Sequence, residues 1–337
     1  MIRAAIVGIG RWGRTLVGGV QGRSEVIRFT AGHNRTRAHA EAFCAESGIA
    51  LSDSLDEILA DPAIDAIVFA TPHSEHGEQV ERAAAAGKHV FMEKPFTLDR
   101  KSAARALDAV AQAGVTLGVA YPRRFHPGMK ELKARIDDGR LGTIAHCYGE
   151  QNSPAGLFMD PRSWRADPAE APAGGMTAMG VHNLDAMIHL FGHIDEVYAS
   201  SVRHTIAYDA EDTTSVMLGF ANGISATLMC CLATAVSYRL AVFGRNGCAE
   251  LVTPELEFRF TPTPAAMPAG RHTQPKPEVI PHPGFNGILA ELEAFAAAIR
   301  GEAPYPIPPE EVLHGVAAFE AIVQSAATHR PIKVAQD

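Results

Sequence analysis

The sequence predicts an α/β protein with two domains, of which the first holds a doubly wound parallel sheet and the second a mostly antiparallel sheet. Three observations lead to this prediction. The chain has 337 residues, more than a single hydrophobic core usually supports. Strand and helix patterns alternate over residues 1–120, as in βαβ units. Beyond residue 143 the pattern becomes rich in strands that hairpin signals connect.

Composition argues against several classes of protein. The net charge is −8 and the pI is near 6.0, whereas a nucleic-acid binder usually presents a basic face. No run of 18 or more apolar residues occurs, so we expect no membrane span. The five cysteines are scattered, and the N-terminus lacks the organisation of a signal peptide. We therefore expect reduced thiols and a cytoplasmic protein.

The first 120 residues contain alternating strands and helices. Short apolar runs predict buried strands, whereas apolar positions at helical spacing that end at a glycine predict helices. On this basis we expect strands at 2–7, 26–32, 65–70, 89–93 and 115–120, and helices at 37–47, 74–86 and 98–113. Strands and helices in this alternation form a parallel sheet.

The pattern changes after Tyr121, where Pro122 and Pro127 mark a domain junction. Asn222-Gly223 between two strand patterns is a strong hairpin signal, so the second sheet is mostly antiparallel. Strands are expected at 143–151, 194–207, 213–221, 223–233, 237–244 and 248–252, and helices at 128–138, 179–191, 288–300 and 309–328. We place the domains at 1–121 and 122–337, with the last helices able to pack back on the first domain.

Two segments, 153–175 and 262–283, are rich in proline. Long loops without regular structure are uncommon in compact domains and often functional. For the second segment, a tolerated surface insertion is an equally good interpretation.

A glycine motif follows the first strand. Gly8, Gly10 and Gly13 match G-x-G-x-x-G between a buried strand and a helix. In this context the first glycine permits a tight turn, the second lets a pyrophosphate approach and the third lets helix and strand pack closely. The phosphates would lie at the helix N-terminus, where free N–H groups favour an anion.

The end of the second strand indicates which dinucleotide binds. NAD binders place an acidic residue there to bond the ribose 2′-hydroxyl. Here Asn34 is followed by Arg35 and Arg37, and no acid occurs before Glu41. Arginine can pair with a 2′-phosphate. The sequence therefore favours NADP over NAD, and the alternative is that Arg35 is a solvated loop residue.

Lys94 follows the strand predicted at 89–93. The carboxyl ends of parallel strands face the ligand crevice in such sheets, so Lys94 would point toward the nicotinamide. A lysine there can bind a substrate hydroxyl and move its proton. A lone lysine at a strand end is ordinarily a surface charge. Here Glu93 and Pro95 on either side favour a functional lysine instead.

Taken together, the motifs resemble the glucose–fructose oxidoreductase / inositol dehydrogenase / rhizopine-catabolism family (Gfo/Idh/MocA). They occur in the family's order along nearly the whole chain: the glycine motif, Thr71-Pro72 with His76, Glu93-Lys94-Pro95, Gly174-Gly175, and Gly180-Val181-His182 with Asp185. The resemblance implies a Rossmann domain, a C-terminal α/β domain with a large open sheet, and NAD(P)-dependent chemistry on a sugar, polyol or related ring. It also implies a homodimer or homotetramer.

The resemblance implies specific contacts. Those to the cofactor would come from Gly8, Gly10, Arg11, Trp12, Gly13, Asn34, Arg35, Thr71, Pro72, His76, Glu93 and Lys94. Pro95 is often cis in the family. Trp164 and Arg165 resemble a pair that reaches the cofactor from the second domain in some relatives. Lys94, Arg124, His182 and Asp185 would contact or position the substrate.

One position departs from the family pattern, which commonly reads D-x-G-x-H. Here Ala178 stands where the aspartate is expected, and His182 remains. His182, Asp185 and His189 share one helical face. By itself this trio fits satisfied polar residues at a domain seam better than a metal site, and we predict no metal. The resemblance makes His182 a catalytic candidate, with Asp185 in support.

We therefore predict an NAD(P)-dependent dehydrogenase or reductase. Lys94 and His182 would share the proton while a hydride passes between nicotinamide and a sugar- or polyol-like secondary alcohol or ketone. Because Ala178 replaces the expected acid, two alternatives stay open. One is a dinucleotide-binding sensor without catalysis, and the other is a dehydrogenase of a non-sugar cyclic diol.

Overall fold

The computed structural model describes residues 1–253, 256–265 and 275–335. The chain divides into two compact units. Unit 1 consists of Met1–Pro122 and Asn286–Val316, and unit 2 consists of Arg123–Phe285 and Ala317–Asp337. The boundary predicted from the sequence between 121 and 122 lies one residue from this division, and a later segment of the chain also belongs to unit 1.

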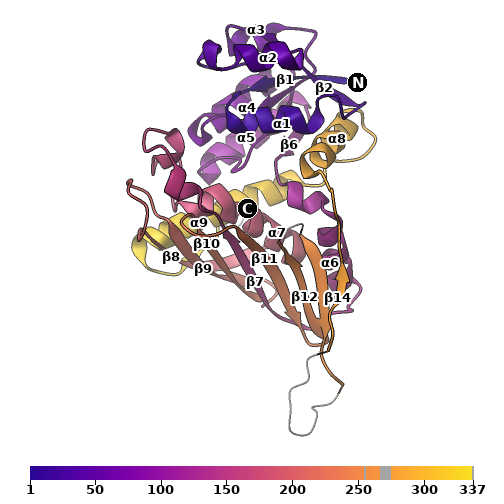
Figure 1. The fold of residues 1–337 in the computed structure, drawn as a ribbon, viewed down its shortest axis with the longest axis vertical. Coiled ribbons are helices and arrows are strands. Elements are labelled where there is room, and N and C mark those ends of the chain that lie inside the picture. Colours follow the sequence, from indigo (N-terminus) through magenta and orange to yellow (C-terminus); the bar gives the residue numbers. More distant parts are fainter. Residues whose placement is uncertain (254–255, 266–274, 336–337) are drawn as a thin grey trace. The chain divides into compact units, whose positions relative to one another are not determined.

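Unit 1 contains a six-stranded parallel sheet, which confirms the predicted Rossmann fold. Its strands are β1 (Ile2–Val7), β2 (Ile27–His33), β3 (Ala50–Leu51), β4 (Ala66–Phe69), β5 (His89–Met92) and β6 (Leu117–Val119). The order is β3-β2-β1-β4-β5-β6 (Figure 1). The chain direction across the sheet reverses between β1 and β4, and ligands bind at such a switch point.

The helices of unit 1 follow its strands. They are α1 (Arg11–Val20), α2 (Glu41–Ser47), α3 (Leu55–Ala60), α4 (His76–Ala85), α5 (Arg100–Ala113) and, from late in the chain, α8 (Gly287–Ile299). Gly19 allows α8 to approach α1, because a methyl group there would lie 2.7 Å from the Ile288 side chain. Phe295 of α8 packs edge-on against Phe91. The late helix is thus part of the unit 1 core.

Unit 2 contains a nine-stranded sheet. Its strands are β7 (Ile144–Asn152), β8 (Ile194–Val202), β9 (Thr213–Phe220), β10 (Ser225–Cys231), β11 (Ser237–Gly244), β12 (Gly247–Val252), β13 (Glu257–Pro262), β14 (Glu278–Ile280) and β15 (Ile332–Lys333). The order is β14-β13-β12-β11-β7-β10-β9-β8-β15. Among the described strands of this second sheet, only β7 and β10 pair in parallel. Gly223 has φ +85° in the predicted hairpin turn.

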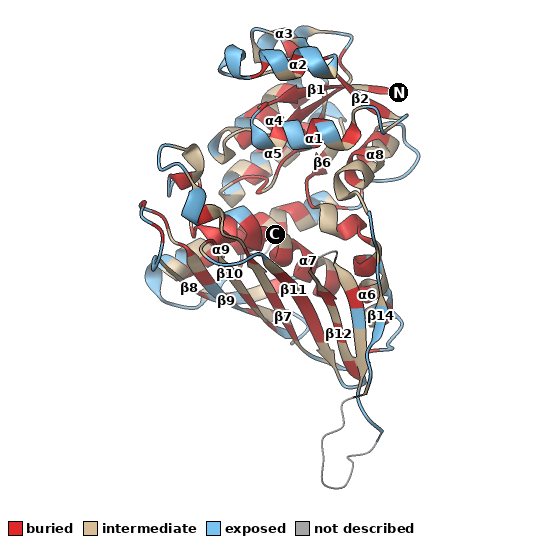
Figure 2. Ribbon diagram, viewed as in Figure 1, coloured by how far each residue is buried: buried red, intermediate tan, exposed pale blue. Residues whose placement is uncertain are grey.

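Helices α6 (Pro127–Asp137) and α7 (Val181–Phe191) lie on one face of this sheet (Figure 1). Buried and exposed residues alternate along β9 and β10, as expected when only one face of a sheet is covered (Figure 2). Helix α9 (Pro309–Thr328) contributes residues to both units. No helix among the described residues is long and apolar enough to span a membrane.

The structure differs from the sequence prediction at three places. The strand expected at 194–207 ends at Val202, because the amides of the next residues bind a side chain: Asp212 Oδ2 accepts hydrogen bonds from His204, Thr205 and Ile206. The helix expected at 37–47 begins with a separate 3₁₀ turn, Arg37–His39. The short elements α3, β3, β13, β14 and β15 were not predicted.

The two proline-rich segments differ in what can be described. Residues 153–175 form short turns, including 3₁₀ turns at Ala155–Phe158 and Trp164–Ala166. In the second segment, 262–283, residues 266–274 lie outside the described part of the chain, and β14 follows them.

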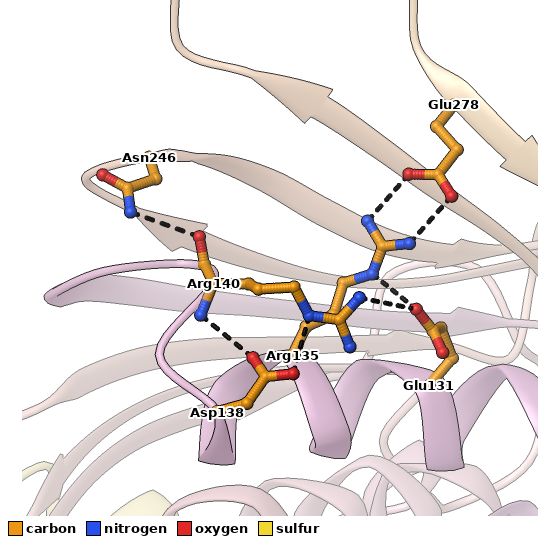
Figure 3. Close-up of polar contacts among 6 residues, drawn as sticks. All are labelled: Glu131, Arg135, Asp138, Arg140, Asn246 and Glu278. Atoms are coloured by element: carbon orange, nitrogen blue, oxygen red, sulfur yellow. Dashed lines mark hydrogen bonds and ion pairs between the residues drawn. The ribbon is translucent and has the colours of Figure 1, made fainter.

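Arg135 attaches β14 to helix α6. Its guanidinium donates to Glu131 at 2.6 Å and makes two hydrogen bonds to Glu278, at 2.8 and 2.9 Å (Figure 3). The same group lies over the rings of Phe258 and Phe260, 4.6 and 5.0 Å from their centroids. The guanidinium holds the pKa of the Glu278 carboxyl below its usual value.

Candidate active site

The glycine turn between β1 and α1 has the geometry that a phosphate-binding loop requires. Gly8 has φ +92°, and a methyl group there would lie 2.4 Å from the Ala70 carbonyl oxygen. A methyl group at Gly13 would lie 2.1 Å from the Gly8 carbonyl oxygen, so helix and turn must touch at this point. At Gly10, by contrast, a methyl group would meet no atom within 4 Å. Gly10 therefore leaves room for a ligand at the N-terminus of α1.

The loop after β2 separates the roles of its two arginines. Asn34 Oδ1 accepts a hydrogen bond from the backbone N–H of Ile9 at 2.9 Å, so this side chain fastens the loop to the glycine turn. Arg37 pairs with Glu41 at 3.1 Å and with Asp53 at 2.5 Å. Arg35 is exposed and makes no hydrogen bond or ion pair with the described residues. Of the two, Arg35 is the one available to a ligand.

Glu93 connects the strand end at β5 to the glycine turn. Its Oε1 accepts a hydrogen bond from the indole N–H of Trp12, and its Oε2 lies 3.3 Å from the backbone N–H of Lys94. The Lys94-Pro95 bond is cis, as the family resemblance implied. These contacts hold Lys94 at the carboxyl end of a central strand, where the sheet presents its ligands.

A second carboxyl group lies near Glu93. Glu291 of α8 is 1% exposed, and its Oε2 has no hydrogen-bond partner among the described residues. Burial, and secondarily the charge of Glu93, raise the pKa of Glu291 well above its ordinary value. Burial therefore favours the protonated, neutral form of the Glu291 carboxyl. The sequence analysis did not identify it, because it lies about 200 residues from Glu93.

His76 is buried between two loops of unit 1. Its Nδ1 lies 2.9 Å from the Pro95 carbonyl oxygen, and its Nε2 lies 3.3 Å from the Thr71 carbonyl oxygen. The Thr71 hydroxyl donates to Gln79 at 2.6 Å. These bonds brace the backbone that follows β4 and β5. His76, predicted as a cofactor contact, is used in this structure to position Thr71 and Pro95.

In unit 2, a π-helical turn at Met176–Gly180 leads into α7. Ala178 is exposed and His182, four residues on, is partly exposed, whereas almost all their neighbours are buried. Gly180 permits this packing, since a methyl group there would lie 2.5 Å from Cys230 Sγ. Residues 178 and 182 thus share the open face of the helix.

Arg124 and Asp185, predicted as substrate contacts, bind each other. Arg124 Nε lies 3.0 Å from both carboxylate oxygens of Asp185, and Nη2 lies 2.6 Å from Oδ1. The side chains are 2% and 6% exposed. Arg124 Nη1 also lies 3.4 Å from His189 Nδ1. This buried pair fixes α7 to the start of unit 2, beside His182.

The sequence analysis missed a group of buried polar atoms beside this pair. We call Arg123, Gln151, Asn183 and Tyr238 the polar cluster. Arg123 lies over the Tyr238 ring, 4.0 Å from its centroid, and Tyr238 is opposite Gln151 across β11 and β7. The Asn183 side chain lies 3.3 Å from the position that a methyl group on Gly149 would take.

Each member of the polar cluster has a buried atom that makes no hydrogen bond of ordinary geometry with the described residues, although Arg123 and Tyr238 interact weakly with each other. These atoms are Arg123 Nη1, Gln151 Oε1, Asn183 Oδ1 and Nδ2, and the Tyr238 hydroxyl. Burial lowers the pKa of Arg123 and raises that of Tyr238. Buried polar groups are rarely left unsatisfied without a functional reason. The cluster could not be recognised in the sequence, because its members come together only through the pairing of β7 with β11.

Trp164 and Arg165 lie in the 3₁₀ turn of the first proline-rich segment. The Arg165 guanidinium lies over the Trp164 ring, 4.1 Å from its centroid, and the Ser163 hydroxyl accepts from the Arg165 N–H at 3.4 Å. The pair is therefore formed within unit 2. Whether it reaches the cofactor stays a prediction. The described residues contain no group of three or more potential metal ligands.

Comparison with known proteins agrees with this arrangement. Residues 2–121 match the model of an oxidoreductase family with an NAD-binding Rossmann fold, and residues 129–250 match the GFO/IDH/MocA C-terminal domain. Inositol 2-dehydrogenase of Rhizobium meliloti (strain 1021) is 28% identical over 99% of both chains. D-xylose 1-dehydrogenase (NADP(+)) 2 of Haloferax volcanii is 28% identical over 89% of this chain and 90% of its own.

Among solved structures, a putative NADPH-dependent oxidoreductase from Desulfitobacterium hafniense superposes with a TM-score of 0.89 at 22% identity. The match covers 99% of this chain and 97% of that one. A dinucleotide turn, a lysine at a central strand end and an open-sheet second unit define an oxidoreductase that binds a nicotinamide cofactor. The chain belongs to the Gfo/Idh/MocA oxidoreductase family.

Proposed function

We propose that this oxidoreductase transfers a hydride between NADP(H) and a secondary alcohol or ketone of a sugar- or polyol-like molecule. The observation that carries the proposal is the position of Lys94 after the carboxyl end of β5, next to Glu93, which is itself bonded to Trp12 of the glycine turn with open space at Gly10. The names of relatives support the substrate class, since they include an inositol dehydrogenase and a xylose dehydrogenase.

The residues present fit a dinucleotide. The open side of Gly10 and the N-terminus of α1 suit a pyrophosphate, and the Glu93 carboxylate suits a ribose hydroxyl. When bound, the nicotinamide supplies or accepts the hydride. The protein supplies the proton: Lys94 Nζ would hydrogen-bond the substrate oxygen and exchange its proton, and His182 would act with it as acid and base. Trp164 and Arg165 are proposed as further cofactor contacts.

Replacement of Lys94 by alanine tests the catalytic role. We expect turnover to fall by at least about 100-fold, the size of a general acid–base contribution, while the dissociation constant for NADPH changes little. The alternative function is a dinucleotide sensor, which the alanine at position 178 favours. A wild-type protein that binds NADPH but is inert on sugars, polyols and cyclic diols would support the sensor instead.

The preference for NADP rests on Arg35. A 2′-phosphate would find the Arg35 guanidinium available, whereas Arg37 is already paired with Glu41 and Asp53. We expect Arg35→Ala to weaken NADPH binding by about 10-fold or more, the value of one charge-assisted hydrogen bond, and to leave NADH binding unchanged. Arg37→Ala is the matched control. Tighter binding of NADH than NADPH by the wild type would contradict the proposal.

We also propose a cytoplasmic homodimer or homotetramer that acts on small molecules. The five cysteines are all free thiols, which suits a reducing compartment. Tyr198 and Met217 are 40% and 61% exposed on the uncovered face of the unit 2 sheet, and a second copy could cover them. Sedimentation of wild type and of Met217→Glu tests this: we expect the variant alone to be monomeric.

A further inference from the structure

The polar cluster and the ion pair beside it carry an uneven number of charges. Arg123 and Arg124 supply two guanidinium groups, which stay protonated in proteins. Asp185 is the carboxylate with the largest electrostatic influence on Arg123, and it already makes three short contacts with Arg124. One positive charge in this part of unit 2 is therefore uncompensated.

The neighbouring groups do not neutralise this charge. Burial raises the pKa of the Cys230 thiol to about 12 and also raises the pKa of Tyr238, so both are neutral near pH 7. On the open face of the helix, positions 178 and 182 hold an alanine and a histidine, so neither supplies a carboxylate. A water molecule can accept a hydrogen bond from Arg123, but it does not balance the charge.

The unpartnered atoms have a mixed hydrogen-bonding character. Arg123 Nη1, Asn183 Nδ2 and the Tyr238 hydroxyl can donate, whereas Gln151 Oε1 and Asn183 Oδ1 can only accept. A simple anion would satisfy the donors and leave the acceptors unsatisfied. A molecule with both a carboxylate and hydroxyl groups satisfies both sets.

Asn183 and Tyr238 are buried, and so are the unpartnered atoms of the cluster, but other parts of two of its side chains reach the surface. Arg123, Gln151 and His182 are partly exposed, and Ala178 is exposed. Cys230 is opposite Gln151 across β10 and β7, and Gly180 packs on Cys230. The cluster thus reaches the same part of unit 2 as the catalytic candidate His182.

We propose that the substrate is a polyhydroxy acid, such as a sugar acid, whose carboxylate pairs with Arg123 and whose hydroxyls meet Gln151. This inference rests on the proposed dehydrogenase function and narrows its substrate from polyols in general to anionic ones. Arg123 is then a residue that determines specificity, and it takes no part in hydride or proton transfer.

The test compares kcat/KM for matched pairs of acid and neutral sugar: D-glucuronate with D-glucose, and D-galacturonate with D-galactose. We expect the wild type to prefer the acids. Arg123→Met should lower kcat/KM for an acid by about 10- to 100-fold, the equivalent of a charge-assisted hydrogen bond, and change that for the neutral sugar by less than about threefold. Arg123→Lys should keep most of the preference.

The control is Arg239→Met, on the next residue of β11 after Tyr238 and on the opposite face of the sheet, where it pairs with Glu250. It should affect both sugars equally. A second measurement does not need turnover: glucuronate should raise the unfolding temperature of wild type, by more than glucose does, and lose this effect in Arg123→Met.

The outcomes separate the two claims. If neutral sugars are preferred, or if Arg123→Met affects both members of a pair alike, the acid substrate is wrong and the dehydrogenase function stands. If no sugar of either pair is turned over and glucuronate does not raise the unfolding temperature, both the acid substrate and the proposed function on sugar-like substrates are contradicted. Turnover of acids that Lys94→Ala leaves unchanged would refute the proposed function instead.

Discussion

Replacement of Asp185 by asparagine should strongly destabilise unit 2. The carboxylate is 6% exposed, and it is bound through three contacts of 2.6 to 3.0 Å to Arg124, which is 2% exposed. Without it, Arg124 remains buried and loses the carboxylate that binds it, and Arg123 loses the same negative neighbour. Breaking a buried ion pair in this way costs about 3–5 kcal/mol, equivalent to a fall of about 10 °C in melting temperature for a unit of this size.

The reverse change, Arg124→Met, should cost less, because Asp185 still lies near Arg123. The double variant Arg124→Met/Asp185→Leu should recover much of the stability, since replacement of both ions by apolar groups is often close to neutral. The protein has two tryptophans. In a Trp12→Phe background, the fluorescence of Trp164 reports unfolding of unit 2 in urea.

Two results would refute this reasoning. One is a loss below about 1 kcal/mol for Asp185→Asn, the value of an exposed ion pair. The other is a double variant whose cost equals the sum of the single ones, which would mean that the two groups are not coupled. A structural pair also predicts that active protein remaining in Arg124→Met keeps its KM, whereas direct substrate contact predicts a raised KM.

Three further outcomes are expected. Gly13→Ala should prevent formation of the turn and destabilise unit 1, whereas Gly10→Ala, with free space around it, should fold normally and bind NADPH about 10-fold more weakly, as calorimetry would show. Glu278→Gln should reduce the loss of stability that the wild type shows below about pH 4.5. The Arg135 contact lowers the pKa of Glu278 in the folded protein, so the ion pair stabilises the fold above the unfolded-state pKa, by up to about 1 kcal/mol. This stabilisation disappears as the pH falls through the folded-state pKa. Glu291→Gln should raise the melting temperature at pH 8 and reduce the loss of stability on going to alkaline pH, because the raised folded-state pKa makes stability fall as the pH increases; a variant less stable than wild type at pH 8 would contradict this.

The parts of the fold that local pattern determines could be predicted. The parallel strands of unit 1 are continuous apolar runs, and Asn222-Gly223 specifies its turn by backbone conformation alone. The same holds for the glycine turn, where close contacts with neighbouring backbone leave no room for a side chain at Gly8 or Gly13. By contrast, β14 and β15 consist of three and two residues, and so short a strand exists only because its neighbour supplies the hydrogen bonds.

The candidate site was predictable where chemistry is tied to a chain position, as for Lys94 at a strand end. It was not predictable where a role depends on a distant partner. Nothing in the sequence marks the raised pKa of Glu291, because this shift depends on burial and on the nearby charge of Glu93. His76 stays a predicted cofactor contact, and the motif could not show that both of its ring nitrogens also face backbone carbonyls.

The neighbouring arginines 123 and 124 show this limit most clearly. They are identical in type and adjacent in the chain, and the sequence favoured Arg124 for the substrate. The 3₁₀ turn at Pro122–Phe125 points the two side chains in different directions, so that Arg124 meets Asp185 and Arg123 meets the ring of Tyr238. An aromatic face attracts a cation but cannot neutralise it. The pairing of one arginine therefore leaves the other to bind a negative group from outside the chain.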